Sequence, residues 1–253
     1  MELTFLGTGA ADFAKDLCTP AMKKLDKNIR RSSALLVNRS LLIDCGPHLC
    51  DELELCCVDP RGIEHILLTH EHGDHFSVQT LAELVGRKGS PIFLWHSEQI
   101  VLPKIDGIVF CPLAMEQSYE IGGCLVTPLG ANHTKGALHF SLECEGKKLF
   151  YGCDGAWLLM PTYYYMKNKA YDVMVMDATV GDYEGDYRMA EHNSIPMIRM
   201  MKKSFLTYGI ATENTEIILS HLARTLHKPH DETCMLVKDD GFTVAYDGMQ
   251  TKV

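Results

Sequence analysis

Residues 65–77 read HILLTHEHGDHFS, an apolar run that leads directly into a cluster of imidazole and carboxylate side chains. The apolar part, HILLT (65–69), predicts a β-strand. The following segment, VQTLAELVGRK (78–88), predicts an α-helix. The polar cluster is therefore expected in the turn between a strand and a helix.

Side-chain geometry brings the polar groups of this turn together. On an extended backbone His70 and His72 point to the same side, because side chains alternate with a period of two. Gly73 lets the chain bend sharply, which can bring Asp74 and His75 to a neighbouring point. Burying so many polar groups costs too much free energy unless something binds them. Imidazole and carboxylate ligands suit first-row divalent cations, so the turn predicts a metal site.

Short apolar runs separated by glycine, proline and aspartate continue in both directions from this turn. They predict further strands at 3–6, 34–37, 41–44, 91–95, 124–130, 138–144, 148–153, 172–177 and 216–220. Longer mixed segments predict helices at 48–58, 156–169, 194–209 and 230–239, and Pro161 interrupts the second of these. Many strands with helices between them indicate an α/β or layered α+β chain. Without a visible linker or repeat, we expect a single domain over residues 1–253.

The charge balance narrows the classes of partner. The 253 residues carry 24 lysines and arginines against 33 aspartates and glutamates, which gives a formal charge of −9. This balance argues against a nucleic-acid partner, because phosphate backbones require clustered lysine and arginine. No stretch approaches the roughly 18 uninterrupted apolar residues of a membrane helix. The opening residues, MELTFLGTGAADF, lack the regions of an export signal, so we expect a cytoplasmic protein without a membrane partner.

The chain has ten cysteines, most of them within apolar runs and none in a Cys-x-x-Cys pair. Without an export signal, reduced and mostly buried thiols are the expected state. A structural zinc site would need closely spaced thiolates, which this sequence does not offer.

A locally basic segment precedes the strand predicted at 34–37, and it contains Lys15, Lys23, Lys24, Lys27, Arg30 and Arg31. A solvated loop is the more frequent use of such a run of charges. The alternative is a rim that attracts a phosphate-bearing ligand, and on that interpretation Arg31 is a candidate substrate contact.

The order of the polar motifs resembles that of the metallo-β-lactamase superfamily. Its H-x-H-x-D-H motif matches the turn at residues 70–75, and three later motifs match PLGANHT, FYGCDGA and IILSHLA, which contain His133, Asp154 and His221. The resemblance implies an αββα sandwich of the α+β class, with two mixed β-sheets face to face and helices on the outer faces.

The same resemblance implies two metal ions. The family pattern places His70, His72 and His133 on one ion, Asp74, His75 and His221 on the other, and Asp154 between them. Ions about 3.5–4 Å apart can hold a hydroxide between them and bind both nonbridging oxygens of a phosphate. Zinc and manganese suit this ligand set, and iron is a third choice.

Within the superfamily the chain is most similar to the phosphoribosyl cyclic phosphodiesterase of the carbon–phosphorus lyase pathway. The shared features are FLGTGAA, RRSS (30–33), ANHT, a histidine in AEHNS, and AYDGM (245–249). That family has a cysteine cluster for structural zinc after the first strand, whereas this chain has only Cys18 there. The resemblance therefore implies chemistry on a small phosphodiester more than that particular substrate. His192, in AEHNS, matches a histidine that approaches the substrate, so it is a candidate general acid, and Asp74 is a second catalytic candidate.

Other polar residues have supporting or open roles. Asp44 and Asp177 end apolar strands, and each is expected to accept the second ring N–H of a ligand histidine. His227 and His230 could line the pocket, and His227 is a candidate substrate contact. His139 is expected to be a strand residue, and the tyrosines at 163–165 could stack on a base but more often pack a core.

Several functions remain open for such a site. The first is a phosphodiesterase acting on a small cyclic phosphate or a nucleotide-like diester through a metal-bridging hydroxide. The alternatives are a thioesterase or lactonase, an RNA 3′-end processing nuclease, and a non-hydrolytic di-iron or metal-binding protein. The natural substrate, the native metal and a homodimeric state are not decided by the sequence.

Overall fold

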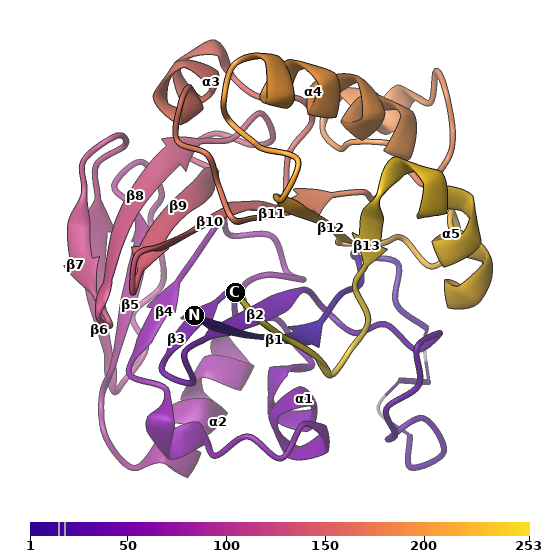
Figure 1. Ribbon diagram of the computed structural model, residues 1–253. Coiled ribbons are helices and arrows are strands. Elements are labelled where there is room, and N and C mark those ends of the chain that lie inside the picture. Colours follow the sequence, from indigo (N-terminus) through magenta and orange to yellow (C-terminus); the bar gives the residue numbers. More distant parts are fainter. Residues whose placement is uncertain (15, 18) are drawn as a thin grey trace.

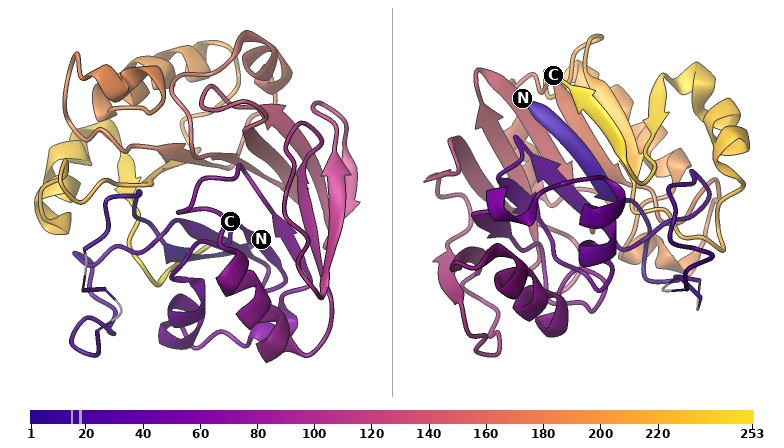
Figure 2. Two further views of the ribbon diagram at one scale, coloured as in Figure 1. Left: turned by 180° about the vertical axis from the view of Figure 1, so that it is seen from behind. Right: turned by 90° about the horizontal axis from the view of Figure 1, so that it is seen from below.

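The computed structural model describes residues 1–14, 16–17 and 19–253. Two seven-stranded sheets lie face to face, with strand orders β14-β1-β2-β3-β4-β5-β6 and β13-β12-β11-β10-β9-β8-β7 (Figure 1). Helices cover the outer face of each sheet, which gives the αββα layering expected from the sequence. Figures 1 and 2 also place the two termini side by side, because β1 and β14 pair antiparallel.

The first sheet and its helices come mainly from the N-terminal half of the chain. Its strands are β1 (Glu2–Gly7), β2 (Ala34–Val37), β3 (Leu41–Ile43), β4 (His65–Leu67), β5 (Ile92–Ser97), β6 (Ile108–Leu113) and β14 (Met249–Lys252). Its outer face packs against α1 (Leu49–Leu55) and α2 (Val78–Lys88), and the short helix η1 (Pro60–Gly62) precedes β4. Ser77 caps α2 by accepting a hydrogen bond from Thr80 N–H, and Gly89 ends it with a φ of 75°.

The second sheet comes from the C-terminal half. Its strands are β7 (Tyr119–Ile121), β8 (Cys124–Gly130), β9 (Leu138–Cys144), β10 (Lys147–Gly152), β11 (Val173–Asp177), β12 (Glu216–Ser220) and β13 (Phe242–Val244). Its helices are α3 (Met160–Met166), α4 (Ile195–Thr207) and α5 (His230–Val237), with the short helices η2 (Tyr187–Ala190) and η3 (Lys238–Asp240). None of the helices in the described part of the chain combines the length and apolar composition that a bilayer span requires.

Alternation along the strands builds three apolar layers. In β2, Leu35 and Val37 face the core between the sheets, whereas Leu36 faces α1 and α2. In β11, Val175 faces the central core and Met174 faces α4. The period of two in side-chain direction therefore explains why these strands are apolar on both faces.

The strand order sets the position of the polar motifs. Strands β3 to β6 run parallel in one sheet, and β10 to β13 run parallel in the other. His70, Asp154 and His221 each follow the carboxyl end of one of these parallel strands. Loops at the carboxyl ends of parallel strands are where α/β sheets bind ligands.

The predicted elements form with small shifts of their ends. The helix expected at 156–169 spans only 160–166, because Pro161 lies in its first turn and begins the helix instead of interrupting it. Strands β6, β7, β13 and β14 are additional to the prediction.

The expectation that every cysteine is reduced is wrong for two of them. Cys124 and Cys144 form a disulfide that joins β8 and β9. Antiparallel pairing of Leu125 with Glu143 places the two cysteines opposite each other, with a Cα–Cα distance of 4.5 Å. Cys18, the other cysteine discussed above, lies outside the described residues.

Candidate metal centre

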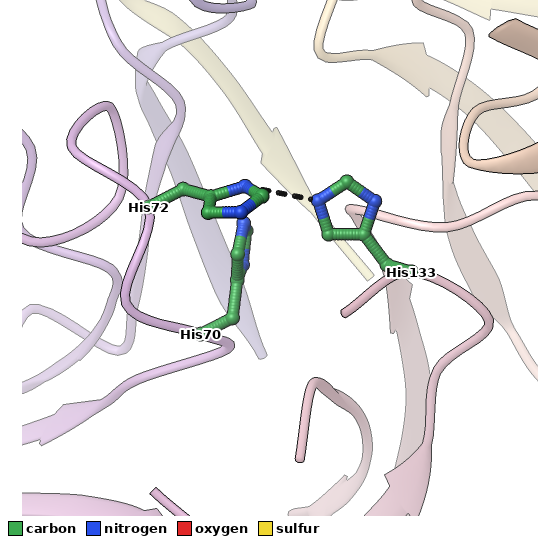
Figure 3. Close-up of side chains that lie close together, drawn as sticks. All are labelled: His70, His72 and His133. Carbon is green, nitrogen blue, oxygen red and sulfur yellow. Dashed lines mark hydrogen bonds between the residues drawn. The ribbon is translucent and has the colours of Figure 1, made fainter. Parts of the chain in front are cut away.

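Three histidines form a first cluster at the edge between the sheets. His70 and His72 lie in the loop after β4, and His133 lies between β8 and β9 of the other sheet (Figure 3). Nδ1 of His72 and Nε2 of His133 are 3.1 Å apart. The ring centroid of His70 lies 4.5 Å from that of His72 and 4.8 Å from that of His133. The three rings could therefore hold one ion.

A second cluster consists of Asp74, His75, His221 and Asp154. The Nε2 atoms of His75 and His221 are 3.2 Å apart, and Asp74 Oδ2 lies 3.3 Å from each of them. Asp154 Oδ1 is 3.0 Å from His221 Nε2, and its Oδ2 is 3.2 Å from His75 Nε2. Asp154 Oδ2 also lies 3.7 Å from His70 Nε2, so this carboxylate lies between the two clusters.

Interatomic distances and unpaired atoms both fit divalent cations. Two atoms bound to one tetrahedral ion at about 2.0–2.1 Å lie about 3.3 Å apart, close to the distances in the second cluster. His70 Nε2 and Asp154 Oδ1 are buried without a hydrogen-bond partner among the described residues. A buried lone pair without a partner is costly, and a bound cation would supply that partner.

Asp44 orients two histidines from the first sheet. Its Oδ2 accepts the Nδ1–H of His75 at 2.7 Å, and its Oδ1 accepts the hydroxyl of Thr69 at 2.9 Å. The Thr69 hydroxyl in turn accepts the Nδ1–H of His70 at 3.0 Å. Burial raises the pKa of Asp44, although the contacts with His75 and Thr69 oppose this. Because both Nδ1 atoms are occupied, both Nε2 lone pairs are left for a metal.

Asp177 and Thr179 provide the same arrangement from the second sheet. The Thr179 hydroxyl donates to Asp177 Oδ1 at 2.7 Å and accepts the Nδ1–H of His221 at 2.7 Å. The backbone N–H of Gly155 donates to Asp177 Oδ2 at 3.0 Å. The sequence predicted that Asp177 would accept the ring N–H of a ligand histidine, but Thr179 lies between Asp177 and His221. Neither Thr179 nor Thr69 was predicted.

His192 stands beside the second cluster. Its Nδ1–H donates to Asp177 Oδ2 at 2.8 Å, and its ring stacks on His221 with a centroid distance of 5.5 Å and an interplanar angle of 18°. Burial lowers the pKa of His192, but the carboxylates of Asp177 and Asp154 outweigh burial and raise it to about 9. With this raised pKa, the imidazole of His192 favours its protonated form at neutral pH. Its Nε2 has no hydrogen-bond partner among the described residues. It also belongs to a third group of ligand-type atoms with Asp154, Asp177 and His221.

His139 is a supporting residue that sequence reasoning assigned to strand packing. Its Nε2–H donates to the backbone carbonyl of Asp154 at 2.9 Å. Burial lowers the pKa of His139 to about 4, so the ring is neutral at physiological pH. A Cβ on Gly155 would lie 2.7 Å from His139 Nε2, which explains the glycine beside the shared carboxylate.

Two predicted substrate contacts do not lie in the site. Arg31 is 1% exposed, donates to Met22 O at 2.7 Å and pairs with Asp247 at 3.5 Å, so its guanidinium is part of the protein interior. His227 donates from Nε2 to Ala178 O at 2.7 Å and lines a different cavity. Both predictions are therefore wrong, because a charge in a basic segment or a nearby histidine does not reveal which way the side chain turns.

The remaining candidates are also outside the site. His230 is buried beside Arg30, with 3.4 Å between its Nδ1 and Nη2 of that arginine. Among the tyrosines at 163–165, Tyr163 and Tyr165 pack against the apolar layer under α4, and Tyr164 is exposed. Lys15, part of the basic segment, lies outside the described residues.

The two clusters open into a cavity of about 320 Å³. Its described wall includes the metal-ligand candidates His72, Asp74, Asp154 and His221, with His192 and Thr179 beside them. Residues of η2 complete one side and the loop at 10–12 the other. The arrangement places a small ligand against both clusters and His192 at once.

Fold and site together define a protein of the metallo-β-lactamase type. The sequence profile of the family described as "Beta-lactamase superfamily domain" matches residues 39–208. The chain therefore belongs to the β-lactamase superfamily.

Curated relatives match parts of the chain. Ribonuclease Z of Bacillus velezensis is 36% identical over 110 residues, which is 43% of this chain and 31% of that enzyme. Ribonuclease Z of Streptococcus pyogenes is 38% identical over 77 residues, 30% of this chain and 22% of the relative. The matched stretches thus cover less than a third of the length of either ribonuclease.

Solved structures match nearly the whole fold. The metallo-β-lactamase fold protein YhfI from Bacillus subtilis has a TM-score of 0.75 at 16% identity, over 99% of this chain and 98% of that one. A diphosphatase from the PhnP family has a TM-score of 0.72 at 16% identity, over 100% and 97%. The short form of human tRNase Z has a TM-score of 0.70 at 20% identity, over 100% and 99%. At these identities the likeness shows a shared fold.

Proposed function

We propose that this chain is a metal-dependent hydrolase with two metal ions, acting as a phosphodiesterase on a small cyclic phosphate or a nucleotide-like diester. One observation carries the proposal: Asp154 lies between the two ligand clusters, and His192 lies on the same cavity wall with its Nδ1–H fixed by Asp177. A diester needs both features, because its phosphate charge must be neutralised and its leaving oxygen must receive a proton.

The ligand atoms divide between two ions. His70, His72 and His133 would hold the first, Asp74, His75 and His221 the second, and Asp154 would contribute one oxygen to each. When bound, two divalent ions supply a nucleophile from water at neutral pH and stabilise the charge that develops on the phosphate. Nitrogen and oxygen ligands suit zinc or manganese, with iron as a third choice.

The protein side chains supply orientation and a proton. His192 donates its Nε2 proton to the departing alkoxide, while Asp177 holds its Nδ1–H at 2.8 Å and keeps the ring in place. Asp74 lines the same cavity and is the second catalytic candidate, besides its place in the second cluster.

Cavity size supports a small substrate. About 320 Å³ is at the lower end of the range for small-molecule sites, which is about 300–1,000 Å³. The formal charge of −9 also disfavours the long phosphate backbone of a large RNA. The PhnP-family diphosphatase among the structural neighbours fits phosphate chemistry on this fold.

An RNA 3′-end processing nuclease is the second candidate, because the curated relatives are ribonuclease Z proteins. The same metal site could cleave an RNA diester. Activity on a folded RNA with a 3′ extension, in preference to small diesters, would favour this candidate.

The test is turnover by the zinc- and manganese-loaded protein on a panel of substrates. We expect hydrolysis of bis(p-nitrophenyl) phosphate and of nucleoside 2′,3′-cyclic phosphates, with little hydrolysis of p-nitrophenyl phosphate. The panel also contains a thioester, a lactone and a precursor tRNA. Turnover of the thioester or lactone without diesterase activity would contradict the proposal, and metal binding without any turnover would indicate a non-hydrolytic metal protein.

A further inference from the structure

The segment between β11 and α4 forms one wall of the cavity. Its short helix η2 contributes Tyr187 and Arg188 to that wall. The backbone carbonyl of Arg188 accepts the N–H of His192 at 2.8 Å, and the carbonyl of Glu191 accepts the Nδ1–H of His133 at 3.2 Å. The position of η2 is therefore tied directly to the general-acid candidate and to a metal-ligand candidate.

Arg188 is the one lysine or arginine among the described residues that line this cavity. Its Nε lies 3.2 Å from Asp186 Oδ1, without the alignment of a hydrogen bond, and this buried Nε has no other partner in the described chain. No side-chain hydrogen bond occupies its two Nη groups within the described residues. The guanidinium thus has free donors, and the cavity that Arg188 lines otherwise carries carboxylates and imidazoles.

Tyr187 is 82% exposed and stands at the rim of the same cavity. Its ring packs on the guanidinium of Arg188, with 5.1 Å from Cζ to the ring centroid. An exposed tyrosine outside the apolar layers does little for the stability of the fold. Beside a guanidinium it offers a flat platform on which an aromatic base can stack.

We propose that Tyr187 and Arg188 select a nucleotide substrate that carries a second phosphate group beside the scissile diester. Arg188 binds the second phosphate through its Nη groups, and Tyr187 stacks on the base. This inference rests on the phosphodiesterase function proposed above and adds the class of substrate.

The chemistry of the two side chains fits this division of roles. A guanidinium presents a planar set of donors that matches a phosphate, and it keeps its charge at every physiological pH. The metal clusters already provide for the scissile phosphate, so the charge of Arg188 serves another anionic group. Stacking on a tyrosine is tolerant of base identity, so selection acts on the presence of a base more than on its type.

Four substrates test the proposal. They are adenosine 2′,3′-cyclic phosphate with and without a 5′-phosphate, and the corresponding methyl riboside cyclic phosphates that lack the base. We expect the 5′-phosphate to raise kcat/KM by about 10- to 100-fold, mainly through KM, because hydrogen bonds to charged groups are strong. The base should raise kcat/KM by about tenfold.

Variants assign each preference to its side chain. Arg188→Gln should reduce the 5′-phosphate preference to about one and keep the base preference, and Tyr187→Ala should do the reverse. Tyr187→Phe should keep the base preference. Arg39→Gln and Tyr164→Ala change an exposed arginine and an exposed tyrosine elsewhere, and both preferences should stay as in the wild type.

The outcomes separate this inference from the proposed function. Turnover without a 5′-phosphate preference, or a preference that survives Arg188→Gln, would overturn the inference alone. The absence of turnover on all four substrates and on bis(p-nitrophenyl) phosphate would overturn the proposed function, and the inference with it.

Discussion

Replacing Thr179 by valine should weaken metal binding strongly, although the substitution hardly changes the size of the side chain. The hydroxyl donates to Asp177 Oδ1 and accepts from His221 Nδ1, both at 2.7 Å, and valine keeps the shape but removes both bonds. Each lost bond to a charged or buried polar group costs about 1–3 kcal/mol, so the free energy of unfolding should fall by about 2–6 kcal/mol. Losing the group that orients a ligand histidine should also weaken metal affinity about 10–100-fold.

The matched control is Thr162→Val in α3. Thr162 is buried like Thr179, but its hydroxyl donates a single bond, to Gly130 O at 2.7 Å, and it lies outside the metal site. We expect a loss of about 1 kcal/mol and unchanged metal affinity. Urea unfolding measures the stabilities, and competition with a chelating dye measures the affinity. If Thr179→Val binds both ions as tightly as the wild type, or if Thr162→Val loses metal equally, the role assigned to the Thr179 hydroxyl is refuted.

Three further predictions concern single residues. Asp154→Ala should lower metal content more than any other substitution in the clusters, because it removes the carboxylate that both share; full metal content by elemental analysis would contradict that placement. His192→Ala should keep both metals and lower turnover of a diester with a poor alkoxide leaving group by about 10²–10⁴-fold, with a much smaller loss for p-nitrophenolate. An equal loss on both would indicate binding and not proton donation. Burial raises the pKa of Asp247 to about 6, whereas an unfolded aspartate titrates near 3.9, so the folded state retains a proton that the unfolded state loses between these values. The stabilisation from this retained proton is therefore fully present below about pH 4. The free energy of unfolding should fall by about 3 kcal/mol as the pH rises through 6. Asp247→Asn should remove this decline, and a wild-type minus variant difference in unfolding free energy that is constant from pH 4 to pH 7 would show that the group does not titrate there.

The sequence predicted the layers of the fold because apolar runs on buried strands are strong local signals. Strands β2, β8, β9 and β12 and helix α2 form with the predicted ends. The strands that escaped prediction are short or lie at sheet edges. Strands β7 and β13 have three residues each, and β14 contains the polar residues of MQTK at the edge of its sheet. Their pairing depends on neighbouring strands, which no local pattern reveals.

The same difference between local and long-range signals explains which residues of the candidate site were predicted. The ligand candidates were found because histidine and aspartate clusters have characteristic spacing along the chain. Thr69, Thr179 and His139 were missed, because their importance comes from contacts with residues distant in sequence or from a hydroxyl that looks ordinary in a strand end. Arg31 was predicted as a substrate contact because its charge suggested an exposed side chain. It is buried instead, and the buried carboxylate of Asp247 pairs with it.

The two clusters draw their ligands from both sheets, and this has a consequence for folding. His70, His72, Asp74 and His75 come from the first sheet, and His133, Asp154 and His221 come from the second. An ion bound there acts as a cross-link between two layers that share an apolar core. The unfolded chain holds these ligands far apart, so binding favours the native state by about 4 kcal/mol when free metal exceeds its Kd a thousandfold. The fraction of chains that stay folded in a cell should therefore follow the supply of metal as well as the temperature.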